Sequence, residues 1–267
     1  MTITVCIKWV LPNRDGDERF AGISLSDQAA LETALVIAES NGEPCTVVTV
    51  GPRAAETSLR DALACGATRA VRVDAPNTTE SAETARLLAK VARSSRLVVC
   101  GDYSADRGSG SVPAFIAAEL AVGQALGLVE VRVVDRSLAV TRRLDGGRRE
   151  TLAIDGAAVV SVEGSVARLR RAPLRASLSA ADAPIEVVGA DDTGAIRRVP
   201  DTASIRPYRP RARVVPSPVG ATALDRVRRV TDATSSKGHG ETVALEPRVA
   251  AERILKSLRE WGYLHES

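Results

Sequence analysis

The chain has 267 residues, enough for one large domain or for one domain with an extension. Hydrophobic residues make up 45% of it and aromatic residues only 3%, so an aliphatic core is expected, which suits helices layered on a buried sheet. A net charge of +3 gives no sign of a nucleic-acid-binding protein, and no apolar run reaches the roughly 18–20 residues that span a bilayer.

The N-terminal segment and the cysteines indicate the compartment. The stretch MTITVCIKWVLP lacks the basic start and the long apolar run of a signal peptide. Cys6, Cys45, Cys65 and Cys100 form no CxxC pair and mostly lie in or beside apolar runs. We interpret them as small buried residues of a reducing compartment rather than as a disulfide frame or a zinc site. A cytoplasmic protein that is not embedded in a membrane is therefore expected.

Apolar runs alternate with helical patterns through the first 120 residues. Ser24 or Ser26 can cap the first helix, Asp27 suits its first turn, and Gly42 ends it. This βαβα order with short connections predicts an α/β fold, a mostly parallel Rossmann-like sheet with helices on both faces. The predicted strands are 3–10, 45–50, 69–75 and 96–100, and the predicted helices are 26–40, 54–65, 79–93 and one that follows residue 111.

After residue 127 the pattern changes to strands joined by tight links. Asp145-Gly146-Gly147 reads as a hairpin turn, and an antiparallel extension of the sheet is predicted. The strand at 184–189 closes a predicted nucleotide-binding domain over residues 1–189. The predicted strands of this part are 129–134, 137–144, 148–154, 157–162 and 184–189.

Residues 190–267 are predicted to form a Pro- and Arg-rich arm. Five prolines between 190 and 218 prevent a regular element there, so an extended course is expected. The arginines of 197–213 are interpreted as a solvated extension rather than a nucleic-acid-binding arm. The segment 246–264 predicts an amphipathic helix that docks on a partner or on the body of the protein.

The stretch GDYSADRGSGSV, residues 101–112, is the candidate binding loop. It lies between a strand end and a helix start, where free backbone N–H groups attract anions. Gly108 and Gly110 would let a phosphate come close, and Ser109 and Ser111 add hydroxyl donors. The loop matches neither a Walker A motif nor GxGxxG, so a plain Gly/Ser loop before a capped helix is an equal alternative.

Four segments together resemble one known family. They are VCIKWV, SLSDQAALETAL, VGPRAAETSLRDALACGATRAVRV and VTRRLDGGRRETLAIDGAAVVSV. The last contains a basic residue, Asp-Gly-Gly, a glutamate and an apolar strand, although Ala157 stands where the family has proline. Over residues 3–189 the chain resembles the β subunit of electron transfer flavoprotein, a family that includes nitrogen-fixation and electron-bifurcating variants.

The resemblance implies an adenine nucleotide α-hydrolase-like fold and a heterodimer. An α subunit would carry the redox FAD, and the β subunit would hold a structural AMP or, in bifurcating members, a second FAD. The family's Asn-Gln-Thr donors are absent from the loop after residue 104, so the ligand stays open. The cofactor-binding residues implied are Cys6, Ser24, Leu25, Ser26, Asp27, Thr49, Val50, Gly101, Asp102, Tyr103, Ser104, Ala105, Asp106, Arg107, Gly108, Ser109, Gly110, Ser111 and Val112.

The segment RLRRAPLRASLSAAD resembles the family's loop that grips dehydrogenases. Leu174 falls where that loop has its anchoring leucine, although an ordinary loop residue that covers the core is an equal alternative. Arg171 replaces an aromatic residue of the family, and a lysine run is missing, which implies a different set of partners. These changes resemble the divergent actinobacterial branch that is linked to mycofactocin.

The sequence thus predicts a non-catalytic subunit of an electron carrier. It contains no acid–base pair, nucleophile or metal constellation. It would help to pass electrons from dehydrogenases through the α-subunit FAD to an acceptor, and a quinone oxidoreductase is a further candidate partner. The alternatives are an electron-bifurcating form with its own FAD and a stand-alone adenine-nucleotide sensor on the same fold.

Overall fold

The computed structural model describes residues 2–11, 20–190, 220–232, 243–261 and 263. The chain divides into two compact units, Met1–Pro200 and Asp201–Ser267. The division predicted after residue 189 stays a prediction.

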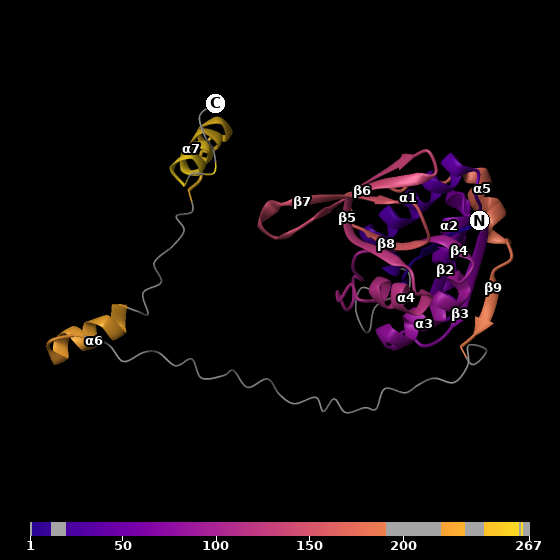
Figure 1. The fold of residues 1–267 in the computed structure, drawn as a ribbon, viewed down its shortest axis with the longest axis horizontal. Coiled ribbons are helices and arrows are strands. Elements are labelled where there is room, and N and C mark those ends of the chain that lie inside the picture. The colour runs from indigo at the N-terminus through magenta and orange to yellow at the C-terminus, as the bar shows by residue number, and fades with distance from the viewer. Residues whose placement is uncertain (1, 12–19, 191–219, 233–242, 262, 264–267) are drawn as a thin grey trace. The chain divides into compact units, whose positions relative to one another are not determined.

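The first unit is built on one sheet (Figure 1). Within the described residues it has nine strands in the order β7-β6-β5-β8-β4-β1-β2-β3-β9. All neighbouring pairs from β5 to β9 in this order are parallel, whereas β6 and β7 continue the sheet in antiparallel pairing. The strands are β1 (Thr2–Cys6), β2 (Cys45–Gly51), β3 (Arg69–Asp74), β4 (Ser95–Gly101), β5 (Gly123–Val134), β6 (Ser137–Arg143), β7 (Arg149–Ile154), β8 (Ala158–Val162) and β9 (Glu186–Gly189).

Helices cover both faces of this sheet, as predicted. Leu31, Leu35 and Leu59 from α1 and α2 belong to one buried apolar cluster, and Leu87 and Ile116 from α3 and α4 belong to a second. Both clusters consist mainly of Ala, Val, Leu and Ile, which confirms the expected aliphatic core. The helices are α1 (Leu25–Asn41), α2 (Glu56–Cys65), α3 (Ser81–Ala92), α4 (Val112–Leu120) and α5 (Leu174–Ala181).

The ends of α1 follow local rules of helix capping. The Ser24 hydroxyl accepts a hydrogen bond from the Asp27 backbone N–H at 3.0 Å, so Ser24 rather than Ser26 is the N-cap. Gly42 ends the helix with a φ of 64°, a left-handed conformation that glycine adopts without a Cβ penalty. The predicted helix over 26–40 is therefore confirmed.

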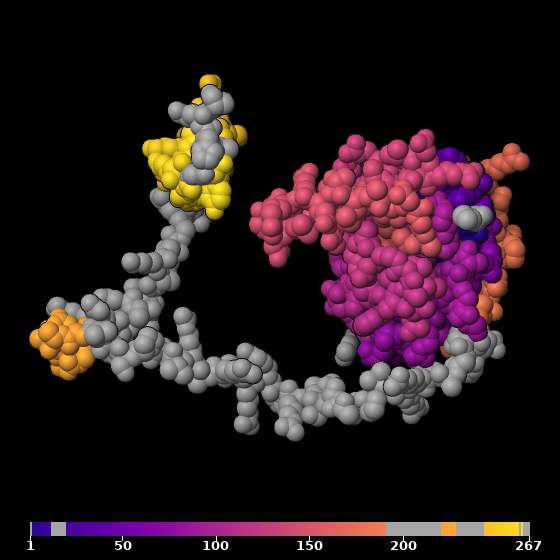
Figure 2. All heavy atoms as spheres, in the orientation of Figure 1, coloured from indigo at the N-terminus to yellow at the C-terminus, as the bar shows by residue number. Residues whose placement is uncertain are grey.

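The antiparallel extension is confirmed for β6 and β7 but wrong for the strand predicted at 157–162. β6 and β7 are joined by the short 3-10 turn Asp145–Gly147, and their hairpin projects beyond the rest of the sheet (Figure 1, Figure 2). β8 instead lies between β4 and β5 and is parallel to both. All five of its residues are buried, which is typical of a strand covered on both faces.

The first strand is shorter than the predicted 3–10. β1 ends at Cys6, although Ile7 and Trp9 are buried. The Lys8 backbone N–H donates to the Asp27 carboxylate rather than to a neighbouring strand, so the ladder stops here. Val10 makes only an isolated bridge with Gly22.

The second unit contains two helices in its described residues. The predicted C-terminal helix is confirmed as α7 (Pro247–Glu260). A helix that the sequence analysis missed, α6 (Ala223–Asp232), precedes it. The extended course predicted for 190–218 falls almost wholly on 191–218, outside the described residues. None of the described helices is long and apolar enough to cross a membrane.

Candidate functional site

A pocket lies at the carboxyl ends of the parallel strands. It is bounded by the ends of β1 and β4, the connection from β3 to α3, and the loop that leads from β4 to α4. Its volume is about 100 Å³. Ligands of open α/β sheets bind at this edge, so the pocket is the candidate functional site.

Many of the residues predicted for the site line this pocket, and others lie beside it. Because side chains alternate along a strand, Val50 faces the pocket while Thr49 is fully buried elsewhere. Predicted residues that line the pocket are Cys6, Asp27, Val50, Gly101, Tyr103, Ser104, Arg107, Ser109, Gly110, Ser111 and Val112. Predicted residues outside the lining are Ser24, Leu25, Ser26, Thr49, Asp102, Ala105, Asp106 and Gly108.

The sequence analysis missed one wall of the pocket. Pro76, Asn77 and Thr79 follow β3, and Thr84 and Leu88 belong to α3. The strand-end rule that pointed to the loop after β4 applies to β3 as well, because the carboxyl end of β3 lies at the same edge of the parallel sheet. The polar segment after β3 was therefore a usable signal.

Asp27 fixes the first turn of α1 against the end of β1. Its Oδ2 accepts a hydrogen bond from the Lys8 backbone N–H at 3.2 Å, and its own backbone N–H donates to Ser24. Burial raises the pKa of the Asp27 carboxyl to about 7, even though these hydrogen bonds favour the ionised form. Asp27 is thus partly protonated near neutral pH.

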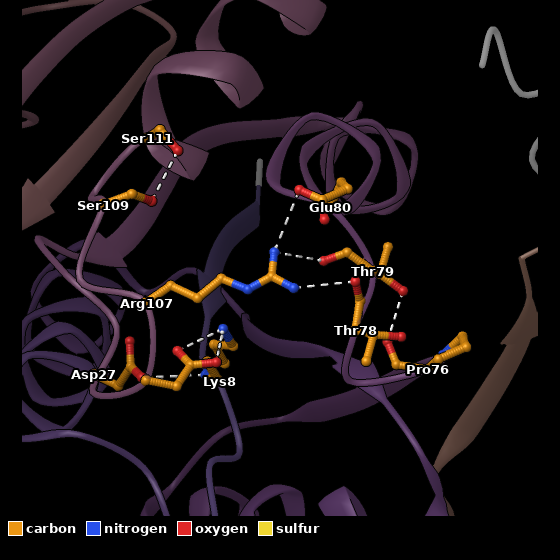
Figure 3. A network of polar contacts seen from close by, with 10 residues as sticks. Lys8, Asp27, Pro76, Thr78, Thr79, Glu80, Arg107, Ser109 and Ser111 are labelled. Atoms are coloured by element: carbon orange, nitrogen blue, oxygen red, sulfur yellow. Dashed lines mark hydrogen bonds and ion pairs between the residues drawn. The ribbon is translucent and has the colours of Figure 1, made fainter. Parts of the chain in front are cut away.

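The loop from β4 to α4 is held at the pocket by two cations. Lys8 Nζ donates to both carboxylate oxygens of Asp106 at 2.7 Å (Figure 3). The Arg107 guanidinium donates to the Thr78 carbonyl at 3.1 Å and forms an ion pair with Glu80 at 3.5 Å. The loop therefore bridges the end of β1 and the start of α3.

Hydroxyl groups and left-handed glycines complete this loop. The Ser109 and Ser111 hydroxyls lie 3.0 Å apart just before the first turn of α4. Gly108 and Gly110 have φ values of 64° and 59°. A Cβ atom on Gly110 would lie 2.5 Å from the Asp102 carbonyl oxygen, so this glycine is needed for the turn of the loop itself.

The pocket combines an apolar wall with a cationic and hydroxyl-bearing rim. Ile7, Val50 and Leu88 supply apolar contacts, and Lys8 and Arg107 are the cations among the lining residues. Such a site suits a flat apolar group joined to an anion. Its volume is below the roughly 300–1,000 Å³ of ordinary ligand pockets, so such a ligand would require side chains at the rim to move.

The described part of the chain offers no metal-binding cluster at this pocket. Among the residues that the structure describes, no group of three or more His, Cys, Asp or Glu side chains could hold a metal ion. Cys6 and Cys100 are paired in register on β1 and β4, and both are buried in the pocket wall. A hydrogen bond with the Cys6 thiol, together with burial, raises the pKa of Cys100, which keeps it in the unreactive thiol form.

Leu174 was expected in a loop, and this expectation is wrong. It is the first residue of α5. The preceding Pro173 is the N-cap of this helix and has an extended backbone conformation. Its side chain is 77% exposed, so it does not cover the core. Leu178, one turn later, is 65% exposed, and the two leucines form an apolar stripe on α5.

Polar contacts fix α5 and the segment before it on α1 and α2. The Arg170 guanidinium donates to Glu32 at 3.0 Å and also pairs with Glu39, both on α1. Arg60 of α2 donates to the carbonyl oxygens of Ala180 and Ala183 at 3.0 Å. The exposed leucines are therefore presented on a supported helix.

The chain is similar to proteins of known family. The electron transfer flavoprotein domain family matches residues 17–193. The electron transfer flavoprotein subunit beta of Methylophilus methylotrophus is 33% identical over 190 residues, which cover 67% of this chain and 72% of that protein.

Two proteins of Bradyrhizobium diazoefficiens are similar at the same level. Its electron transfer flavoprotein subunit beta is 32% identical over 162 residues, which cover 60% of this chain and 65% of that protein. Its Protein FixA is 33% identical over 180 residues, which cover 63% of this chain and 62% of that protein. The matched region thus spans less than two thirds of these two relatives.

Proposed function

Because the chain belongs to the electron transfer flavoprotein family, in its β-subunit branch, we propose that it is the β subunit of a heterodimeric electron carrier. In this proposal an α subunit holds the redox FAD, and dehydrogenases supply the electrons that pass through it to an acceptor. In this proposal the β subunit contributes binding surfaces rather than chemistry.

The pocket supports a structural adenine nucleotide as its ligand. The observation that carries this proposal is the loop from β4 to α4, which brings Arg107, Ser109 and Ser111 to the pocket beside Lys8. Two cations, two hydroxyls and a helix N-terminus suit a phosphate group, and the apolar wall suits a base. We favour AMP over FAD because the lining supplies one apolar wall for a base and one cationic, hydroxyl-bearing rim for a phosphate.

Exposed apolar side chains support contacts with partner proteins. On α7, Val249, Ile254 and Leu255 are exposed, and on α6 so is Leu224. We propose that these two helices bind the α subunit, because an amphipathic helix of this length is only marginally stable without a surface to pack on. We propose that the α5 leucines bind dehydrogenases, because Leu174 and Leu178 are exposed beside the exposed Arg171 and Arg175. An apolar centre with a charged rim is typical of an interface anchor.

The test is to co-express the chain with the α subunit and to analyse the purified complex. We expect a heterodimer with one flavin and one AMP, and poor solubility of the chain expressed alone. Two flavins per heterodimer would favour the electron-bifurcating form. A monodisperse, cooperatively folding monomer that binds a nucleotide without any flavoprotein partner would favour a sensor and contradict the proposal.

A further inference from the structure

Lys8 and Asp106 form an ion pair at the rim of the pocket. Lys8 Nζ lies 2.7 Å from both carboxylate oxygens, and the two side chains are 36% and 33% exposed. The lysine lines the pocket, whereas the aspartate lies outside its lining. Asp106 thus neutralises a pocket cation without being a lining residue itself.

The other cation of the pocket is also engaged by protein groups. Arg107 donates to the carbonyl oxygens of Thr78 and Thr79 and pairs with Glu80. Both cations among the lining residues therefore already have protein partners when a phosphate enters the pocket. It must share or replace the partner of at least one of them.

Lys8 is the cation that can change its partner more easily. Lysine binds as a point charge on a flexible stem, whereas the planar guanidinium of Arg107 is fixed by several acceptors. The Lys8–Asp106 pair is partly exposed, so its contribution to stability is small and its rupture is cheap.

We propose that Asp106 is an affinity-determining residue, an internal anion that competes with the ligand's phosphate for Lys8. This inference rests on the proposed function, because it concerns the same nucleotide pocket. In the nucleotide-bound protein Lys8 turns from the Asp106 carboxylate to the phosphate. The pocket then prefers a doubly charged phosphate over weaker anions, because only the stronger anion displaces the carboxylate.

Asp106 stays ionised over the physiological pH range. Its partial burial acts to raise its pKa, but hydrogen bonds from Lys8, Ser104 and the Arg107 backbone outweigh burial and lower the pKa. The competition therefore depends on the ligand and not on a change in pH near neutrality.

The test compares AMP with adenosine, which lacks the phosphate. Equilibrium dialysis would measure both dissociation constants for the heterodimer freed of nucleotide, as wild type and as Asp106→Asn. We expect Asp106→Asn to bind AMP roughly 2- to 5-fold more tightly, which is the size of effect expected when one partly exposed ion pair is removed. Adenosine binding should not change. Asp135→Asn, at an exposed position in the turn between β5 and β6, controls for the same change in net charge.

A second variant keeps the inference testable if Asp106→Asn folds poorly. Lys8→Gln should weaken AMP binding and leave adenosine binding unchanged. AMP affinity that is unchanged or lower in Asp106→Asn, or unchanged in Lys8→Gln, would overturn the competition while the nucleotide site stands. A wild-type heterodimer that binds neither AMP nor adenosine would instead overturn the proposed nucleotide site, and the competition with it.

Discussion

Gly101 at the end of β4 touches Asp27 in the first turn of α1. A Cβ atom on Gly101 would lie 2.7 Å from Asp27 Oδ1 and 3.0 Å from the Asp27 backbone nitrogen. The close approach of these two residues places the start of the binding loop directly beside the N-terminus of α1. The shape of the pocket thus depends on the absence of a side chain at position 101.

Gly101→Ala should destabilise the protein. The added methyl group meets a buried carboxylate and helix backbone, neither of which can move freely. Overpacking of this kind costs about 1–3 kcal/mol, measurable as a lower midpoint of urea unfolding. Gly156→Ala is the matched control, since nothing lies within 4 Å of its added Cβ. Equal stability of the two variants would contradict the crowding at Gly101.

Asp27→Asn should alter the pH dependence of stability. The pKa of Asp27 is raised from 3.8 to about 7, so the folded state binds a proton more tightly than the unfolded state. In the wild type, the neutral Asp27 carboxyl contributes its full share of the free energy of unfolding below about pH 4. This contribution decreases by about 4 kcal/mol as the pH rises to about 7. Asparagine cannot ionise and keeps an acceptor for the Lys8 backbone N–H.

The measurement for Asp27→Asn is urea unfolding of the purified complex between pH 4.5 and pH 8. The variant should gain stability relative to wild type as the pH rises through this range, and the difference should level off above about pH 7. A constant difference across the range would mean that Asp27 titrates near its ordinary pKa. Asp61→Asn, at an exposed residue of α2 whose carboxyl pKa is raised by partial desolvation, provides a comparison of the same chemical change.

Gly110→Ala should remove the nucleotide through the shape of the loop. The sequence suggested that this glycine lets a phosphate approach, but its Cβ would strike the Asp102 carbonyl oxygen at 2.5 Å. We expect AMP extracted per heterodimer to fall while flavin on the α subunit is unchanged. Gly147→Ala has a similar φ of 74° with open space around its Cβ, so it controls for backbone strain alone. Wild-type AMP content in Gly110→Ala would exclude this loop from the site.

The sequence predicts the parallel part of this fold well because the rules there are local. Ser24 and Gly42 cap α1 as their residue types dictate, and the alternation of strands and helices leaves few possible topologies. α6 was missed even though Thr222 and Asp225 form a capping box that the sequence displays. Apart from this capping box, the short polar segment gave no indication of a helix.

The position of β8 and the contacts of the site depend on tertiary structure. The link after β7 is tight, which favoured antiparallel pairing of the next strand, but β8 pairs in parallel with both β4 and β5 in the folded sheet. Lys8 and Asp106 are 98 positions apart, and no sequence rule pairs them. Sequence reasoning therefore placed the candidate site at the edge of the sheet where the pocket lies, and it named many but not all of the residues that line this pocket.

Leu174→Ala should weaken docking of a dehydrogenase without weakening the fold. The Leu174 side chain is 77% exposed at the start of α5, so its truncation leaves no core cavity, and stability should change by less than about 0.5 kcal/mol. As an interface anchor it should contribute about 1–3 kcal/mol to partner binding. The assay is electron transfer from the cognate dehydrogenase as a function of carrier concentration, with a melting curve of the same heterodimer. Val134→Ala, an exposed apolar residue at the end of β5, controls for the loss of surface hydrophobicity. A raised apparent KM with an unchanged Tm supports docking through α5, whereas an unchanged KM would assign this leucine no role in the interface.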